Sequence, residues 1–180
     1  MFMEQHEFEK GKYVVYGTNG ICLIEDIKLM KFAYDSDKST YYILKPVSSD
    51  ASTVYVPEKN EELMAKLRPI MTKDDIHSLL LGMKGKEIQW ENDRRYRTES
   101  FHEILSQGVT QNLLLMIRCI YMRKKELMPL GKKLPMTDEN TLKTAEKLVE
   151  EEFAYALSIE KNQVNEYIRN LLAVSDEIAQ

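Results

Sequence analysis

The spacing of apolar residues changes near residue 70, and this change constrains the fold more than any other feature of the sequence. Before it, short runs of aromatic and β-branched residues alternate with polar stretches, which is typical of strands and turns. After it, apolar residues recur at the three- and four-residue spacing of helices. We therefore expect an α+β protein with two domains, residues 1–70 and 71–180.

The first part predicts four or five short strands. The pair Asn19-Gly20 indicates a tight hairpin turn, because the central positions of such a turn require positive φ. Pro57 cannot donate to a strand ladder and is expected to end the last strand. The strand-like runs are residues 13–16, 21–27, 41–44 and 53–56. Strands this short usually close into a small β-barrel, because closure removes exposed edges.

The second part predicts an all-α bundle. Thr72 can cap the first helix, Gly108 stands where a second helix could stop, and Thr137 can cap a later one. Pro129 and Gly131 are expected to end the long helix that starts near Val109. Apolar stripes mark the helices: residues 76, 79 and 80; 101, 104 and 105; 113 to 121; 142 to 157; and 164 to 172.

Composition excludes several classes of protein. The 180 residues carry a formal net charge of −4, which argues against a histone-like protein that coats DNA. No apolar run is long enough to span a bilayer, and the N-terminus lacks the features of a signal peptide, so we expect no membrane partner and a cytoplasmic location. Cys22 and Cys119 lack the spacing of a disulfide framework or a zinc site and are expected to be buried thiols.

Catalytic patterns are weak. His6, His77 and His102 have no serine or cysteine motif beside them, and the glycines of residues 82–86 lack the spacing of a phosphate-binding loop. We expect no enzyme activity, no cofactor, no metal and no small-molecule substrate. A cavity that His77 or His102 shares with carboxylates would change this interpretation.

The segment of residues 83–97 is the most unusual part of the chain, because it places the only tryptophan between lysines and arginines. A large flat side chain near cations can wedge between bases while the cations neutralise phosphates. Alternatively, Trp90 fills the bundle core and the arginines pair with Glu91 and Asp93. The candidate DNA contacts are Lys84, Lys86, Trp90, Arg94, Arg95 and Arg97.

Two further charge patterns bear on DNA binding. A second basic stretch surrounds residues 129–131; it could face phosphates or simply complement a helix end. Residues 138–180 hold four basic and ten acidic residues, a balance of −6, so the last two helices should mostly repel DNA. The second basic stretch consists of Arg118, Arg123, Lys124, Lys125, Lys132 and Lys133.

The order of these parts resembles the CarD/CdnL family of bacterial transcription regulators. Phe8-Glu9-Lys10-Gly11-Lys12-Tyr13-Val14-Val15-Tyr16 is similar to the opening of that family's polymerase-interaction domain, which transcription-repair coupling factors share. The absence of helicase sequence and the presence of the Trp90 segment favour the free-standing regulator. The matching segments are residues 8–16, 19–20, 42–45, 54–57, 67–68, 90, 94–97 and 101–108, with the helix before Leu134.

The resemblance implies a Tudor-like or SH3-like barrel that pairs an exposed strand with the RNA polymerase β subunit. It also implies that Trp90 is a wedge at the upstream edge of the melted promoter bubble, where it slows closure of the DNA. Arg94, Arg95 and Arg97 would contact phosphates. Tethering to polymerase would explain how an acidic protein makes weak contact with promoter DNA.

The sequence departs from the family pattern at two places. Family members carry arginines on the polymerase-facing strands, whereas the matching positions here are Met30 and Tyr55. The candidate polymerase contacts are Lys28, Met30, Lys31, Val54 and Tyr55. Residues 137–140, where a basic residue is common, are acidic here, so we expect lower DNA affinity.

A different interpretation is a non-catalytic adaptor. Its barrel would bind a partner other than polymerase, and its helical bundle would be structural only. Recovery of a different partner from cell extract, without the β subunit, would favour it.

Overall fold

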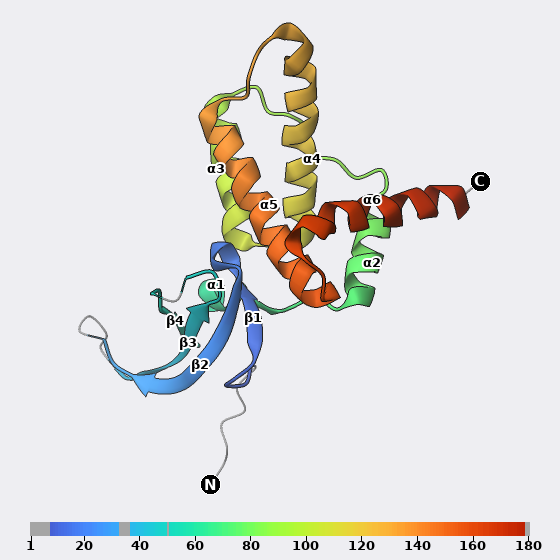
Figure 1. The fold of residues 1–180 in the computed structure, drawn as a ribbon. Coiled ribbons are helices and arrows are strands. Elements are labelled where there is room, and N and C mark those ends of the chain that lie inside the picture. Colours follow the sequence, from blue (N-terminus) through green and yellow to red (C-terminus); the bar gives the residue numbers. More distant parts are fainter. Residues whose placement is uncertain (1–7, 33–36, 50, 179–180) are drawn as a thin grey trace. The chain divides into compact units, whose positions relative to one another are not determined.

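The computed structural model describes residues 8–32, 37–49 and 51–178, with side chains to residue 171. Its internal contacts divide the chain into two compact units, Met1–Ile70 and Met71–Gln180. We call them the N-terminal unit and the helical unit. Each has its own elements (Figure 1) and its own core, as expected for an α+β chain.

The N-terminal unit is a five-stranded antiparallel sheet in the order β4-β3-β2-β1-β5. In the described residues β4 and β5 pair on one side only, so the sheet is open and the predicted closure into a barrel is not confirmed. The short helix α1 and strand β5 were not predicted. The elements are β1 (Tyr13–Tyr16), η1 (Gly17–Asn19), β2 (Ile21–Met30), β3 (Ser39–Pro46), β4 (Val54–Pro57), α1 (Glu61–Met64) and β5 (Leu67–Pro69).

The turn between β1 and β2 differs in detail from the prediction. A 3₁₀ turn over Gly17–Asn19 joins the strands, and Gly17 and Gly20 have positive φ while Asn19 does not. Tyr16 N–H donates to the Gly20 carbonyl at 2.9 Å, which closes the turn. The predicted hairpin is confirmed, but it needs one more residue than the Asn-Gly turn that we expected.

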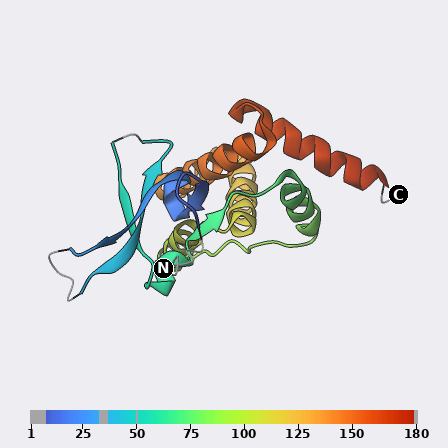
Figure 2. The ribbon, with the colours of Figure 1, turned by 90° about the horizontal axis from the view of Figure 1, so that it is seen from below.

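A β-bulge in β2 decides which side chains face the core. The register pairs Ile24 with Leu44 and then Asp26 with Ile43, so Glu25 is an extra residue. Because side chains alternate along a strand, the extra residue reverses the orientation of every later one. Ile27 consequently packs on the core cluster of Val14, Tyr16, Cys22, Ile24, Tyr42, Leu44, Val56 and Leu67. The long β2–β3 hairpin curves in both views (Figures 1 and 2).

Helix ends in the helical unit follow local chemistry in most places. Thr72 forms a capping box with Asp75, Asp93 caps the next helix, and Gly108 ends it in the left-handed conformation. The predicted cap at Thr137 is wrong, because the helix begins at Met136 and places Thr137 inside the first turn. The helices are α2 (Lys73–Gly82), α3 (Arg94–Gln107), α4 (Thr110–Leu127), η2 (Met128–Leu130), α5 (Met136–Leu157) and α6 (Lys161–Ile178).

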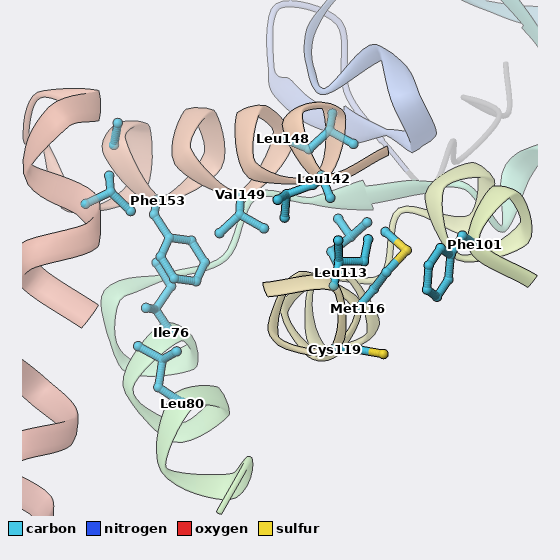
Figure 3. Close-up of a cluster of buried hydrophobic side chains, with 14 of the residues drawn as sticks. Ile76, Leu80, Phe101, Leu113, Met116, Cys119, Leu142, Leu148, Val149 and Phe153 are labelled. Carbon is cyan, nitrogen blue, oxygen red and sulfur yellow. The ribbon is translucent and has the colours of Figure 1, made fainter. Parts of the chain in front are cut away.

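The core of the helical unit lies between α4 and the helices around it. Phe101 of α3 lies beside Met116 of α4, and Ile76 of α2 approaches Phe153 of α5 (Figure 3). Ile76, Met116 and Phe153 are each 0% exposed. Burial of such side chains contributes roughly 1.5–3 kcal/mol each. The fifteen buried members that this cluster has among the described residues therefore hold the bundle together.

Both cysteines are free and buried, as predicted. Burial raises the pKa of the Cys22 thiol to about 12. In the described parts of the chain, no helix is long and apolar enough to cross a bilayer.

Candidate nucleic-acid interface and docking face

Trp90 lies in the connection between α2 and α3, where it is half-buried. Its ring packs edge-on against Phe101, with 6.3 Å between the ring centroids, and it borders the bundle core. The two interpretations of Trp90 were a core residue or an exposed wedge. The structure places it between them, with part of the indole in the core and part at the surface.

A hollow of about 210 Å³ opens beside the exposed part of the indole. The connection that carries Trp90 forms one wall, and α4 forms the other. Arg118 is exposed at this hollow, while Cys119 is buried in its wall. Neither His77 nor His102 lines it. The lining residues are Glu87, Ile88, Gln89, Trp90, Leu115, Arg118, Cys119, Met122, Arg123 and Glu126.

Arg97 is 4% exposed, which corrects its assignment as a phosphate contact. Its Nε and Nη2 donate to the two carboxylate oxygens of Asp138, at 3.2 and 2.9 Å. Its Nη1 donates to the Glu91 carbonyl at 2.7 Å. The guanidinium carbon lies 4.4 Å from the Trp90 ring centroid. A guanidinium enclosed in this way cannot reach a phosphate.

Arg94 and Arg95 are exposed at the N-terminal end of α3. Asp93 starts this helix by accepting from Arg95 N–H at 2.8 Å and from Tyr96 N–H at 3.2 Å. The Arg95 side chain pairs with Glu99 at 3.1 Å, in solvent. Cations at a helix N-terminus oppose the helix dipole, so the dipole does not explain these two arginines.

Lys84 and Lys86 are also exposed, in the same connection as Trp90. Lys86 N–H donates to the Met83 carbonyl at 3.0 Å, which holds the chain in a turn after α2. The structure therefore places both lysines on the chain segment that leads to the indole.

Tertiary structure adds Arg123 of α4, which we had placed only in the second basic stretch. Its guanidinium carbon lies 5.6 Å from the Trp90 ring centroid, and it pairs with Glu126 at 2.8 Å. No pattern in the sequence indicates this approach, because it depends on how α4 packs against the connection before α3.

The acidic residues at the start of α5 were expected to lower DNA affinity, but both carboxylates make contacts within the helical unit. Asp138 points inward and is 2% exposed, and Glu139 pairs with Lys124 at 2.9 Å. These two carboxylates are neutralised within the helical unit, so they oppose DNA less than their number indicates.

In the N-terminal unit, the sheet face opposite the core carries Lys28, Met30 and Tyr55. The register places Lys28 opposite Tyr41, Met30 opposite Ser39 and Tyr55 opposite Ile43, so all three side chains share one face. Phe32, which we had not predicted, packs edge-on against Tyr55, with ring centroids 5.3 Å apart. It also packs against Tyr41, at 5.1 Å.

Two other candidates lie elsewhere. Val54 pairs with Leu44 and is half-buried against the core cluster, on the opposite face from Tyr55. Lys31 is exposed just beyond β2.

Lys28 is 60% exposed and pairs with Asp26 at 2.8 Å. Hydrogen bonds from Lys28 and Lys10 lower the pKa of Asp26 to about 2.

Residues 8–71 match the family model described as the CarD-like/TRCF RID domain. The N-terminal unit belongs to this domain family. The resemblance to CarD-like proteins is thereby confirmed for the RID domain, and the match ends where the helical unit begins. No curated protein matches the chain.

Proposed function

We propose that this protein is a non-catalytic transcription regulator that binds RNA polymerase through its RID domain and touches promoter DNA through its helical unit. The observation that carries the proposal is the RID match over residues 8–71, because this is a polymerase-interaction domain. The DNA contact is proposed for the upstream edge of the melted bubble, where it would lengthen the life of the open complex.

The docking element that we propose is the edge strand β4, with the polymerase β subunit as partner. An edge strand offers unpaired backbone groups to an incoming strand, and side chains on alternate positions give specificity. Tyr55 is 42% exposed on this strand, and Phe32 supports its ring. Docking would then depend on an aromatic contact at the position where other family members carry arginine.

The DNA contact that we propose consists of Trp90 with Arg94, Arg95, Lys84 and Lys86. The partly exposed indole has the properties of an apolar wedge, and the four cations stand at the surface near it in the sequence. Because the chain is acidic overall, binding to polymerase would supply the effective concentration that a weak DNA contact needs.

The first test is the half-life of the promoter open complex with the cognate polymerase. The wild-type protein should lengthen it, and Trp90→Ala should remove most of that effect without weakening binding to polymerase. Tyr155→Ala is the matched control, because Tyr155 is 50% exposed on α5. Circular dichroism establishes that both variants fold. Equal half-lives with wild type and Trp90→Ala would exclude the wedge.

The second test is polymerase affinity. Tyr55→Ala should weaken binding roughly tenfold or more, because exposed aromatic anchors often contribute over 1.4 kcal/mol to an interface. Tyr13→Ala on β1 is the matched control, because Tyr13 is 43% exposed and Tyr55 is 42% exposed. Unchanged affinity for Tyr55→Ala would move the docking site away from β4. Recovery of another partner without the β subunit would favour an adaptor.

A further inference from the structure

The helical unit contains a buried ion pair, Arg97 with Asp138, that also contacts the chain segment of Trp90. The side chains of Arg97 and Asp138 are only 5% and 2% exposed. Two hydrogen bonds join them in the bidentate arrangement that fixes a guanidinium in a single orientation. Arg97 comes from α3 and Asp138 from the first turn of α5, so the pair joins two helices of the bundle.

The same guanidinium also holds the chain next to Trp90. Its Nη1 donates to the carbonyl of Glu91 at 2.7 Å and approaches that of Asn92 at 3.4 Å. Its carbon lies over the indole at 4.4 Å from the ring centroid. One side chain therefore contacts the ring of Trp90 and the two residues that follow it.

Stability alone is a poor reason for such a pair. Taking two charges out of water is costly, and apolar residues of similar volume often serve a core equally well. A bidentate pair does fix the orientation of both side chains, because each hydrogen bond is directional. In the described residues no buried side-chain nitrogen or oxygen lacks a hydrogen-bond partner, so this network is complete.

We propose that Asp138 and Arg97 are positioning residues for Trp90. Asp138 fixes the Arg97 guanidinium, and Arg97 fixes both the backbone after Trp90 and the plane of the indole at the hollow beside α4. The indole is thereby held in one orientation before it meets DNA. The use of this orientation rests on the proposed function, whereas the positioning itself does not.

The test uses the full-length chain and the fluorescence of Trp90, which is its only tryptophan. Asp138→Asn keeps the shape of the side chain and removes its charge. The double variant Arg97→Met/Asp138→Leu replaces the pair with apolar side chains, so the core can stay folded without the clamp. Glu139→Gln is the matched control, because it neutralises the adjacent carboxylate, which pairs at the surface with Lys124.

We expect the folded double variant and Asp138→Asn to show at least a twofold larger acrylamide quenching constant and a lower fluorescence anisotropy for Trp90. Glu139→Gln should match the wild type. Far-ultraviolet circular dichroism shows which variants are folded. If Asp138→Asn is unfolded, the quenching and anisotropy of the double variant test the positioning role. Unchanged quenching and anisotropy in a folded double variant would overturn the positioning role.

Open-complex half-life then connects positioning to function. The double variant should lose most of the lengthening that the wild type gives, at unchanged polymerase affinity. If Trp90→Ala shortens the half-life while the double variant does not, the positioning role in function is overturned. If Trp90→Ala has no effect either, the wedge fails, and the quenching result still decides whether the pair positions the indole.

Discussion

At the start of α3, Arg94 and Arg97 stand three residues apart and have opposite environments. Arg94 is exposed, while Arg97 is enclosed by Asp138, the Glu91 carbonyl and the Trp90 ring. The sequence shows both as members of one basic cluster. The difference comes from Asp138, which lies 41 residues away in the chain. Residue type therefore predicted a cation-rich segment, but only packing separated its surface members from its buried one.

Asp26 gives a prediction on pH at the same scale. Hydrogen bonds from Lys28 and Lys10 lower its pKa from 3.8 to about 2 in the folded chain. A depressed pKa stabilises the fold above the unfolded value, and this contribution is lost as pH falls from about 4 to about 2. The wild-type chain should lose stability across this range.

The variant Asp26→Asn should lose less stability over the same range, because it has no carboxylate to protonate there. Urea unfolding of both proteins from pH 5 to pH 2 measures the difference, and a carboxyl-resolved NMR titration gives the pKa of Asp26 directly. Identical pH dependence of the two unfolding free energies would contradict the prediction.

At the scale of elements, short-range interactions made most helix boundaries predictable from the sequence. The Thr72 hydroxyl and the Asp75 carboxylate satisfy free backbone donors of α2, and Gly108 takes the left-handed conformation at the end of α3. These interactions involve residues only a few positions apart, so a sequence shows them. The bulge at Glu25 and the short strand β5 were missed, because their partners Ile43 and Val15 belong to other strands.

Two glycines at helix ends should respond in opposite directions to alanine. Gly108 has φ +64°, where a Cβ is strained, so Gly108→Ala should destabilise the helical unit by about 1 kcal/mol. Gly82 is the last residue of α2, and a Cβ there would meet no atom within 4 Å. Gly82→Ala should therefore stabilise by roughly 0.4–1 kcal/mol.

The midpoints of urea unfolding for the two variants and the wild type give the comparison. Each variant is the control for the other, because the substitution is the same and only the backbone conformation differs. A stabilising effect of Gly108→Ala would contradict the helix end described for α3.

At the scale of the whole molecule, two cores share no residue, and each contains one buried thiol. Cys22 belongs to the sheet cluster and Cys119 to the helical cluster. Burial raises the pKa of both thiols, and a thiol that stays protonated and enclosed reacts slowly with electrophiles. The two cysteines can therefore report separately on the opening of the two units.

Phe153→Ala should speed labelling of Cys119 and leave labelling of Cys22 unchanged. Phe153 is 0% exposed, and its truncation should cost about 3–5 kcal/mol in the helical core. Where opening limits the reaction, that cost corresponds to roughly a hundredfold faster labelling or more. Mass spectrometry of the labelled peptides at pH 8 follows each cysteine in the same sample. Equal acceleration of both cysteines would show that the two cores open together.

The sequence by itself determined the α+β class, the strand and helix periods, most helix ends and the resemblance that the RID match confirms. All of these depend on residues near one another in the chain. Tertiary structure decided that the sheet is open, that Val54 faces the core, that Phe32 joins Tyr55, and that Arg97 is enclosed with Asp138 behind a half-buried Trp90. Those features depend on contacts between residues far apart in the chain. A pattern of residue types does not show which distant residues come into contact.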